Sequence, residues 1–457
     1  MPRGLPKALK ITFIIVAVIA GIILIISGIG AILDRSAYHV ILADAEDALA
    51  YFSRFHYDDD GNAWKYYSEA AEKADSSGSD RELFRYLSGE IEITYNTMKA
   101  ILNNLEIIEL IREGAKQDYY SYPYEFEKGI AAEIPSYIGL LRAVDITCIK
   151  ALYDMENGRN ETALEDLFGV MMAGKHVAGG VMIMDYMAGF SLVKRGLRVL
   201  RIGIASGAFN EEQLEEISEF LDDLEKHWPL LSEAIGAEAK RMRITFAEAS
   251  AKDIGLTVFC GDEGVDHFGF AKMFIVRLFC WRSFFSPYRS LHTCFVFMDE
   301  IFNELERIES NAMDSLTDRI ENKAFVALQG KVDSFRKKNF FFNIAAPDYG
   351  RMLRRKMKEM MEIRLIHTSS LVAAYRLEKG DFPGSIEELA KHLIVDFGTG
   401  KQLQYTNYID SVIIFIPGLD DEDADDALSI TLTRLGIKQY LDDKRNNFLE
   451  NKKRQDK

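Results

Sequence analysis

Residues Ile11–Leu33 read ITFIIVAVIAGIILIISGIGAIL, a stretch without a single ionisable side chain. As a helix it would rise roughly 34 Å at about 1.5 Å per residue, enough to cross a hydrocarbon core of about 30 Å. We therefore predict that Ile11–Leu33 forms a transmembrane helix in a lipid bilayer. A cleavable signal peptide is the alternative, but its apolar core is shorter, about 7–15 residues, and ends in a small-x-small site. Ile32-Leu33-Asp34 is no such site, which favours a retained anchor.

The charges around this stretch predict its orientation. Arg3, Lys7 and Lys10 precede it without an acidic residue, whereas the two charges that follow it cancel each other. By the positive-inside rule, residues 1–10 form a short cytoplasmic tip and the bulk of the chain is extracytoplasmic. We therefore expect a single-pass protein of the cell inner (cytoplasmic) membrane.

The composition is that of a folded, acidic and mainly helical protein. Hydrophobic residues make up 48% of the 457 positions and charged residues 28%, which supplies ample core and argues against a disordered chain. Only nine prolines occur, which favours helices. The net charge is -16 at pH 7, and this argues against a nucleic-acid binder because phosphate binding needs concentrated positive charge.

Apolar periodicity and helix-capping residues divide the rest of the chain into a series of helices. We expect an extracytoplasmic α-helical domain over 34–347, a long helix with a small α+β module over 348–440, and a basic tail over 441–457. The first half of the long helix is strongly basic and is expected to be solvated, whereas its second half is expected to pack. The predicted helical segments are 36–55, 63–74, 82–113, 135–157, 160–179, 181–204, 210–227, 229–251, 295–335 and 349–379.

Two of these helices form a predicted antiparallel hairpin. Asn157-Gly158 ends the first helix and Asn160 begins the second, an arrangement similar to one tetratricopeptide unit. No second copy of the pattern is visible, so no solenoid is predicted. Asp145 and His176 are the polar residues nearest the apolar faces of the hairpin. Neither has a triad partner or metal-ligand spacing, and we interpret both as structural groups with hydrogen-bond partners.

Three further stretches have a structural and a functional interpretation. The aromatic loop Tyr119–Phe126 either packs onto its own helices or stacks on sugars or peptides. The charged residues between Glu238 and Arg243 have a spacing that suits a solvated helix face with ion pairs. Residues 268–290 carry four cations and eight aromatic rings without an acidic residue.

Residues 268–290 are interpreted as a buried segment whose cations pair with acidic groups or extend to water. The alternative is contact with anionic lipid or with a partner protein. The residues that would make this contact are Lys272, Arg277, Trp281 and Arg282.

The C-terminal region is predicted to be a helix followed by a small antiparallel sheet. The long helix ends at Gly380, and Ser385 caps a short helical turn. Residues 402–406 and 411–416 read as the two strands of a hairpin, and residues 428–433 are a candidate third strand.

Three phrases of this region carry a family resemblance. Gly380–Leu389, Asp396–Tyr405 and Gly418–Asp426 resemble the C-terminal part of the major pseudopilins of type II secretion systems. The resemblance implies a helix that leads into a small sheet, closed by an acidic loop. It covers only the end of the chain, and the N-terminal processing motif of pilins is absent.

In the pseudopilins, the closing acidic loop binds calcium. The positions that could supply hard oxygen ligands here are Asp420, Asp423, Asp425 and Asp426. This loop lacks the glycine of the pseudopilin phrase, so a solvated loop without a metal is the alternative. No cofactor other than calcium is expected.

The whole chain carries a second set of shared phrases, beyond the anchor and the C-terminal module. They are Asn62–Tyr66, the helix with Gly129, Pro135, Leu141 and Arg142, and the hairpin Gly158–Leu164. With these phrases the chain is similar to a family of single-pass membrane proteins of planctomycete-type bacteria. What this likeness implies is architecture, not chemistry.

These patterns predict a membrane-anchored extracytoplasmic helical scaffold that binds other proteins of the envelope or of an export apparatus. The alternatives are an envelope hydrolase and a lipid- or ligand-binding protein without a recognisable motif. The sequence contains no Gly-x-Ser-x-Gly, His-Glu-x-x-His or phosphate-loop motif, which favours a non-enzymatic function.

A melting experiment separates the two interpretations of the acidic loop. If the carboxylates of Asp420–Asp426 hold calcium, the bound ion stabilises the folded protein by mass action. Millimolar calcium is then expected to raise the melting temperature of the purified protein, and a chelator to lower it. A melting temperature that responds to neither treatment excludes the calcium site.

Overall fold

The computed structural model describes residues 35–55, 60–75, 104–131, 133–251, 287–314, 322–338, 349–389, 403–408, 411–416 and 428–433. The predicted anchor Ile11–Leu33 lies outside these ranges. Within them, no helix combines the length and the apolarity that a bilayer crossing requires. The anchor therefore stays a prediction from the sequence.

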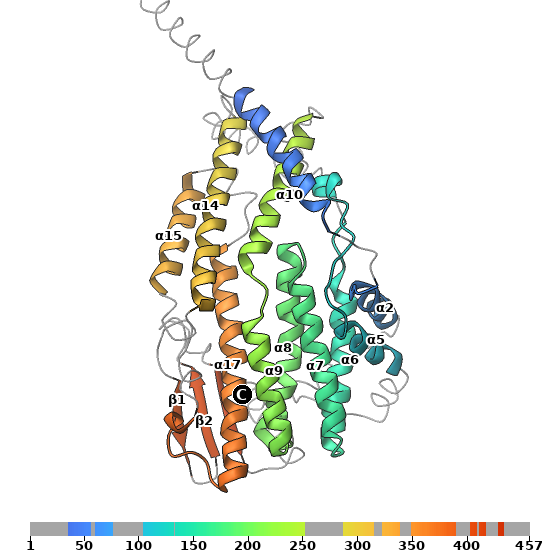
Figure 1. Cartoon of the computed structure of the whole chain (residues 1–457), viewed down its shortest axis with the longest axis vertical. Helices are drawn as coiled ribbons and strands as arrows, with labels where there is room; N and C mark the ends of the chain where they lie inside the picture. The colour runs from blue at the N-terminus through green and yellow to red at the C-terminus, as the bar shows by residue number, and fades with distance from the viewer. Residues whose placement is uncertain are drawn as a thin grey trace, which may run out of the picture.

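The described chain is mainly helical and contains a small antiparallel sheet, as predicted (Figure 1). Residues 35–52 form the first described helical segment. The helices that follow are α2 (Trp64–Asp75), α5 (Leu105–Ala115), η1 (Phe126–Ala131), α6 (Tyr137–Glu156), α7 (Asn160–Ala178), α8 (Ile183–Ser206), α9 (Glu211–Lys226), α10 (Leu231–Ala251), α14 (Pro287–Asp314), α15 (Asn322–Lys338), α17 (Tyr349–Lys379) and η3 (Ile386–Glu388). Of the predicted helix 82–113, only the part in α5 is described.

The helices form an elongated bundle (Figure 1). α6, α7, α8 and α9 run along the long axis, and α2 and α5 pack on the outer side of α6 and α7. α17 packs against α8 and α9 and leads to the sheet at one end of the molecule. The segment 35–52 lies at the opposite end with α10 and α14.

Local capping signals set several helix ends where the sequence predicts them. α6 ends at Glu156 and α7 begins at Asn160, which confirms the predicted hairpin. At the start of α9, Asn210 Oδ1 accepts a hydrogen bond from the Gln213 backbone N–H at 2.9 Å, and Gln213 Oε1 accepts one from the Asn210 N–H at 3.1 Å. This reciprocal capping box satisfies two N–H groups that have no partner within the helix.

α7 and α8 approach each other closely at a pair of glycines. A Cβ on Gly189 would lie 2.4 Å from the Gly174 carbonyl oxygen, and a Cβ on Gly174 would lie 2.8 Å from the Gly189 carbonyl oxygen. Both distances are too short for any real Cβ contact, and the opposing atoms belong to the backbone. Only glycine therefore allows the two helix backbones to pack at this separation.

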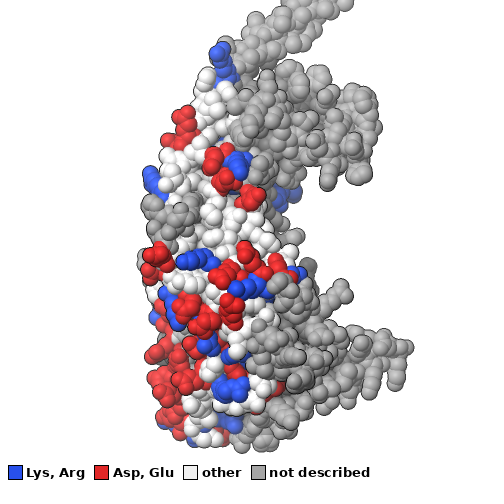
Figure 2. Space-filling view, turned by 90° about the vertical axis from the view of Figure 1, so that its right-hand side faces the viewer, with Lys and Arg blue, Asp and Glu red and all other residues white. Residues whose placement is uncertain are grey.

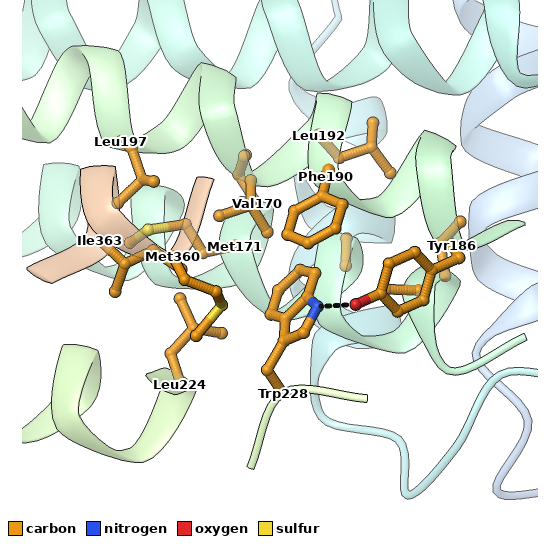
Figure 3. Close-up of a cluster of buried hydrophobic side chains, with 14 of the residues drawn as sticks. Val170, Met171, Tyr186, Phe190, Leu192, Leu197, Leu224, Trp228, Met360 and Ile363 are labelled. Carbon is orange, nitrogen blue, oxygen red and sulfur yellow. Dashed lines mark hydrogen bonds between the residues drawn. The ribbon is translucent and has the colours of Figure 1, made fainter. Parts of the chain in front are cut away.

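Large aromatic and aliphatic side chains fill the space between α7, α8, α9 and α17 (Figure 3). The ring of Trp228, just after α9, stacks on Phe190 with 4.6 Å between ring centroids. Its indole N–H donates to the Tyr186 hydroxyl at 3.2 Å. Met171 and Met360 lie in the same cluster, so α17 belongs to the core of the bundle.

The charged residues of α10 correct one expectation from the sequence. Glu238 and Arg243 are each only 7% exposed, so this stretch is not a solvated face. Arg243 pairs with Asp299 of α14 at 2.6 Å and reaches Asp44 of the segment 35–52 at 3.7 Å. The expected ion pairs are present, since Arg241 also pairs with Glu238 at 2.5 Å. The expected solvated face was wrong because elements distant in sequence pack against α10.

α17 has the predicted bounds but a different pattern of burial. Residues 359–370, in the middle of the helix, are buried, whereas most described side chains at either end are partly or fully exposed. The expectation of a solvated first half and a packed second half is therefore wrong. Ion pairs of buried α17 residues explain the difference. Arg364 pairs with Glu225 of α9, and Glu359 pairs with the partly exposed Lys194 of α8 at 3.3 Å.

The sheet confirms the three predicted strands. β1 (Gln404–Asn407), β2 (Ser411–Ile416) and β3 (Leu428–Thr433) are antiparallel neighbours in this order. Within the register, the buried residues Val412 and Leu432 lie opposite each other. The side chains of one face pack toward α17 and α8, so the module is docked on the bundle.

The close contact between Gly174 and Gly189 predicts that a glycine-to-alanine substitution has opposite effects on stability at Gly189 and at a helical glycine without neighbours. Gly189→Ala is expected to destabilise the protein by about 1–3 kcal/mol, because the new methyl group overlaps the backbone of α7. Gly330→Ala in α15 is the matched control, since a Cβ there meets nothing within 4 Å. It should stabilise the protein by up to about 1 kcal/mol through helix propensity. Urea unfolding midpoints measure both, and an unchanged midpoint for Gly189→Ala would contradict the close approach.

Candidate functional site

Neither group of site residues predicted from the sequence falls in the described ranges. These residues are Lys272, Arg277, Trp281, Arg282, Asp420, Asp423, Asp425 and Asp426. Membrane or partner contact and calcium binding at these positions therefore stay predictions. Within the described part of the chain, no group of three or more His, Cys, Asp or Glu side chains is arranged to hold a metal ion.

The aromatic loop packs onto the helices, which agrees with the structural interpretation. Tyr120, Tyr124 and Phe126 are buried. Tyr124 donates from its hydroxyl to Asp185 at 2.5 Å, and Tyr137 of α6 donates to the same carboxylate oxygen. The loop is thereby tied to the start of α8.

Asp185 is a fully buried carboxylate in the first turn of α8. Its second oxygen accepts from the Met182 backbone N–H at 2.9 Å, so the side chain also caps α8. Burial raises the pKa of Asp185 to about 6, although its three hydrogen-bond donors act in the opposite direction. With 0% exposure, the carboxylate is out of reach of a substrate, and we interpret it as a structural group.

His176 and Asp145 have structural partners, as the sequence predicts. His176 Nδ1 lies 3.0 Å from the hydroxyl of the buried Tyr67. Burial lowers the pKa of His176 to about 4, with a smaller contribution from Lys175, so the ring is neutral at pH 7. Asp145 accepts from Arg195 Nε at 2.7 Å.

Ser218 and His367 form a pair that sequence reasoning missed. The Ser218 Oγ lies 2.8 Å from His367 Nε2, between α9 and α17. A hydroxyl hydrogen-bonded to an imidazole is one part of a nucleophilic catalytic site. Such a site also needs hydrogen-bond donors that stabilise the oxyanion formed in the reaction. Both residues lie in the interior of helices, where the neighbouring backbone N–H groups are used by the helix itself. We therefore interpret this pair as an interhelical contact.

A pocket of about 150 Å³ lies where α8, α9 and α17 meet the sheet. Gly207 is the C-cap of α8 and lines the pocket. Its φ is +68°, a conformation that glycine adopts without strain. The pocket is lined by Ile204, Ser206, Gly207, Phe209, Leu214, Ala373, Arg376, Leu377, Phe382, Leu432 and Thr433. Its walls combine apolar side chains with the polar groups of Ser206, Arg376 and Thr433.

Arg376, in the last turn of α17, is the cation of this pocket. Its Nη1 donates to the Thr433 carbonyl oxygen at 3.1 Å, and its guanidinium carbon lies 4.9 Å from the centroid of the Phe382 ring. Thr433 in turn donates from Oγ1 to the Ala205 carbonyl oxygen of α8 at 3.2 Å. The pocket thus joins the bundle and the sheet, and we regard it as the candidate functional site.

Comparison of the chain with models of protein families, with characterised proteins and with solved structures gave no match. The resemblances to pseudopilins and to planctomycete-type membrane proteins therefore depend on the quoted residues alone.

The buried Asp185 and His176 predict opposite responses to pH. Asp185 has a higher pKa in the folded protein, about 6, than its ordinary 3.8, so its contribution to stability falls as pH rises through about 4–6. His176 has a lower pKa in the folded protein, about 4, than its ordinary 6.5, so its contribution falls as pH drops through about 6.5–4.

Two variants separate these contributions. Relative to the unmodified protein, Asp185→Asn should make the slope of unfolding free energy against pH more positive between about pH 4 and 6, and His176→Gln more negative. Each change is at most about 1.4 kcal/mol per pH unit. Urea unfolding at several pH values measures the slopes. If both variants keep the slope of the unmodified protein, the two groups do not titrate as described.

Proposed function

We propose that the chain is a single-pass, membrane-anchored scaffold that presents its C-terminal sheet to other proteins of the extracytoplasmic envelope. One observation supports this most directly. The helical segment 35–52, which follows the predicted anchor Ile11–Leu33, lies at one end of the molecule, and the sheet lies at the other (Figure 1). A membrane anchor at residue 33 would therefore hold the sheet at the end remote from the bilayer.

A presenting scaffold must hold its binding surface in a fixed orientation, and the contacts of the sheet meet this requirement. Tyr405 of β1 donates to the Pro383 carbonyl oxygen at 2.6 Å, and Asn407 donates to the same oxygen at 3.1 Å. On the other edge, Thr433 of β3 contacts both Arg376 and Ala205. The sheet is thus attached to α17 and to α8 by separate hydrogen bonds.

The surface near the sheet has features of a protein contact area. Tyr408, after β1, is 54% exposed, and Leu377 of α17 is 49% exposed. α9 presents several exposed carboxylates. Acidic side chains also gather toward the lower end of the face in Figure 2, which is the side of the bundle turned away from the sheet. We expect a partner whose surface combines basic and apolar groups, since complementary charge favours encounter and register.

Photo-crosslinking in cells tests the proposal at the two ends of the molecule. The photoreactive amino acid benzoylphenylalanine at Tyr408 is expected to give discrete crosslinked products with envelope proteins. The matched control is the same amino acid at Val296 of α14, which is 44% exposed but lies on a helix that packs near the segment 35–52. We expect the control to give none of these products, because it lies outside the presented surface.

Two results of the crosslinking experiment would contradict the proposal. Absence of discrete products at Tyr408, or the same products at both positions, would remove the sheet as the binding surface. Protease added to intact spheroplasts checks the orientation separately. Survival of the full-length chain there would place the bulk of the protein in the cytoplasm and overturn the extracytoplasmic assignment.

A further inference from the structure

We propose that the basic tail 441–457 docks on the acidic face of α9 within the same chain. The acidic face is defined by five exposed side chains in the first half of the helix: Glu211, Glu212, Glu215, Glu216 and Glu219. This inference is independent of the scaffold function. It depends on the charge of the α9 face, on the charge of the tail and on the place where β3 ends.

The five glutamates lie on one side of α9. With 3.6 residues per turn, their positions cover about 140° of the helix circumference. The opposite side packs against the bundle through the buried side chains of Leu214, Ile217 and Leu221. The acidic face is therefore directed outward and is accessible to a docking segment.

The charge of this face is not compensated in the described part of the chain, where none of the five glutamates pairs with a cation. The second half of α9 differs, because Asp222 pairs with Lys226 at 2.6 Å and Asp223 pairs with Lys175 of α7 at 3.1 Å. Like charges four positions apart on a helix repel each other, and the five glutamates contain three such pairs. The helix dipole offsets negative charge only in the first turn. The acidic face therefore favours a segment with several positive charges.

The C-terminal tail supplies positive charge of similar magnitude. Residues 444–457 contain six cations and two acidic residues, a net charge of +4 in a protein whose net charge is -16. A single exposed ion pair contributes little to a contact, but several pairs in one contact act together. Because the tail is tethered to the sheet, its effective concentration at a nearby surface is on the order of millimolar. A weak electrostatic contact is then sufficient for docking.

The end of β3 lies beside the first turns of α9. Thr433, its last residue, donates from Oγ1 to the Ala205 carbonyl oxygen in the last turn of α8 at 3.2 Å. Thr433 and Leu214 of α9 also line the junction pocket, which is the pocket between the bundle and the sheet. Residue 441 follows Thr433 by eight positions, which span at most about 26–29 Å. α9 has 16 residues and is about 24 Å long, so the tail can reach the whole acidic face.

An anionic membrane surface is the alternative site for a basic tail. The segment 35–52, which follows the predicted anchor, lies at the end of the molecule opposite the sheet (Figure 1). A tail that leaves the sheet is then remote from the lipid head groups, whereas the acidic face of α9 is close to it. The position of the sheet therefore favours α9.

A docked tail changes what the acidic face can bind. A basic protein must displace the tail before it contacts the glutamates, and the displaced tail stays attached and continues to compete. The tail therefore restricts the acidic face to partners with a higher density of positive charge than its own.

Zero-length crosslinking of the full-length protein tests the proposal. The protein is placed in phosphatidylcholine nanodiscs and treated with a carbodiimide, which joins a lysine amine to a carboxylate in direct contact. We expect the acidic face to form links with the lysines of the tail, which are Lys444, Lys452, Lys453 and Lys457. Glu300 and Glu306 of α14 are also exposed and serve as the internal control. They should form no link with the tail.

Two further conditions identify the surface that holds the tail. In a mixture of ¹⁵N-labelled and unlabelled protein, docking within one chain gives links only between peptides that carry the same label. Docking on a second copy also gives links between labelled and unlabelled peptides. In nanodiscs that contain phosphatidylserine, the links should persist, because α9 and not the lipid holds the tail.

Cleavage of the tail by trypsin measures docking without a crosslinker. A variant with Glu→Gln at all five positions of the acidic face removes the charge and keeps the helix propensity. We expect it to raise the rate of cleavage within residues 444–457 about tenfold at low salt, because the released tail is accessible. The matched control is Glu300→Gln with Glu306→Gln, which should leave the rate unchanged. Salt at about 1 M should speed cleavage in the unmodified protein but not in the variant, relative to a free peptide of the tail sequence.

The proposal is wrong if no link joins the tail to the acidic face, if links join only differently labelled copies, or if phosphatidylserine abolishes them. An equal cleavage rate in the folded five-glutamine variant and the unmodified protein would also overturn it. The crosslinks in the unmodified protein decide the matter if the variant fails to fold. Crosslinking from Tyr408 tests the scaffold alone, so the two proposals can fail independently.

Discussion

The close approach of α7 and α8 is the constraint on which the rest of the bundle depends. Gly174 and Gly189 let the two backbones meet without intervening side chains, and this sets the separation of the helices. α6 packs on one side of this pair, and α9 and α17 pack on the other. Because interiors are close-packed, a wider α7–α8 separation would displace the stacked Phe190 and Trp228 and the surrounding core. The two ends of α8 lie at the two polar sites described above. Asp185 is at its start, and the pocket between the bundle and the sheet is at its end.

Many of the polar groups that look reactive in isolation are used to join elements. Asp185 links the aromatic loop, α6 and α8, while His367 links α17 to α9. Glu309 of α14 accepts from the Leu231 and Ser232 N–H groups at 3.0 and 2.9 Å, at the start of α10, and also pairs with Lys356. Breaking one partner of such a buried pair leaves a charge without compensation, so these residues favour a single arrangement of the helices.

Sequence patterns predicted the elements well where the signal was local. The capping box of Asn210, the stop before Asn157 and the bounds of α17 all depend on neighbouring residues, and the structure agrees with them. The burial of Glu238 and Arg243 was missed because the spacing of charged residues along a helix does not depend on what neutralises their charge. The same spacing occurs when water solvates the charges and when a distant residue pairs with them. The Ser218–His367 contact joins positions 149 residues apart, and no periodicity could bring them together. The junction pocket was missed for the same reason, since its walls come from α8, α9, α17 and β3.

The buried charges of α17 have a consequence for the order of folding. α6, α7, α8 and α9 follow one another in the chain, so their contacts close short loops and can form early. The pairs Arg364–Glu225 and Lys194–Glu359 instead span 139 and 165 residues. We therefore expect α17 to join after α6, α7, α8 and α9 have packed together. Until then, the groove that receives it exposes Glu225 and Lys194 to water beside its apolar side chains. We expect these charges to disfavour association between incomplete chains, because an apolar surface interrupted by charged groups is a poorer contact area.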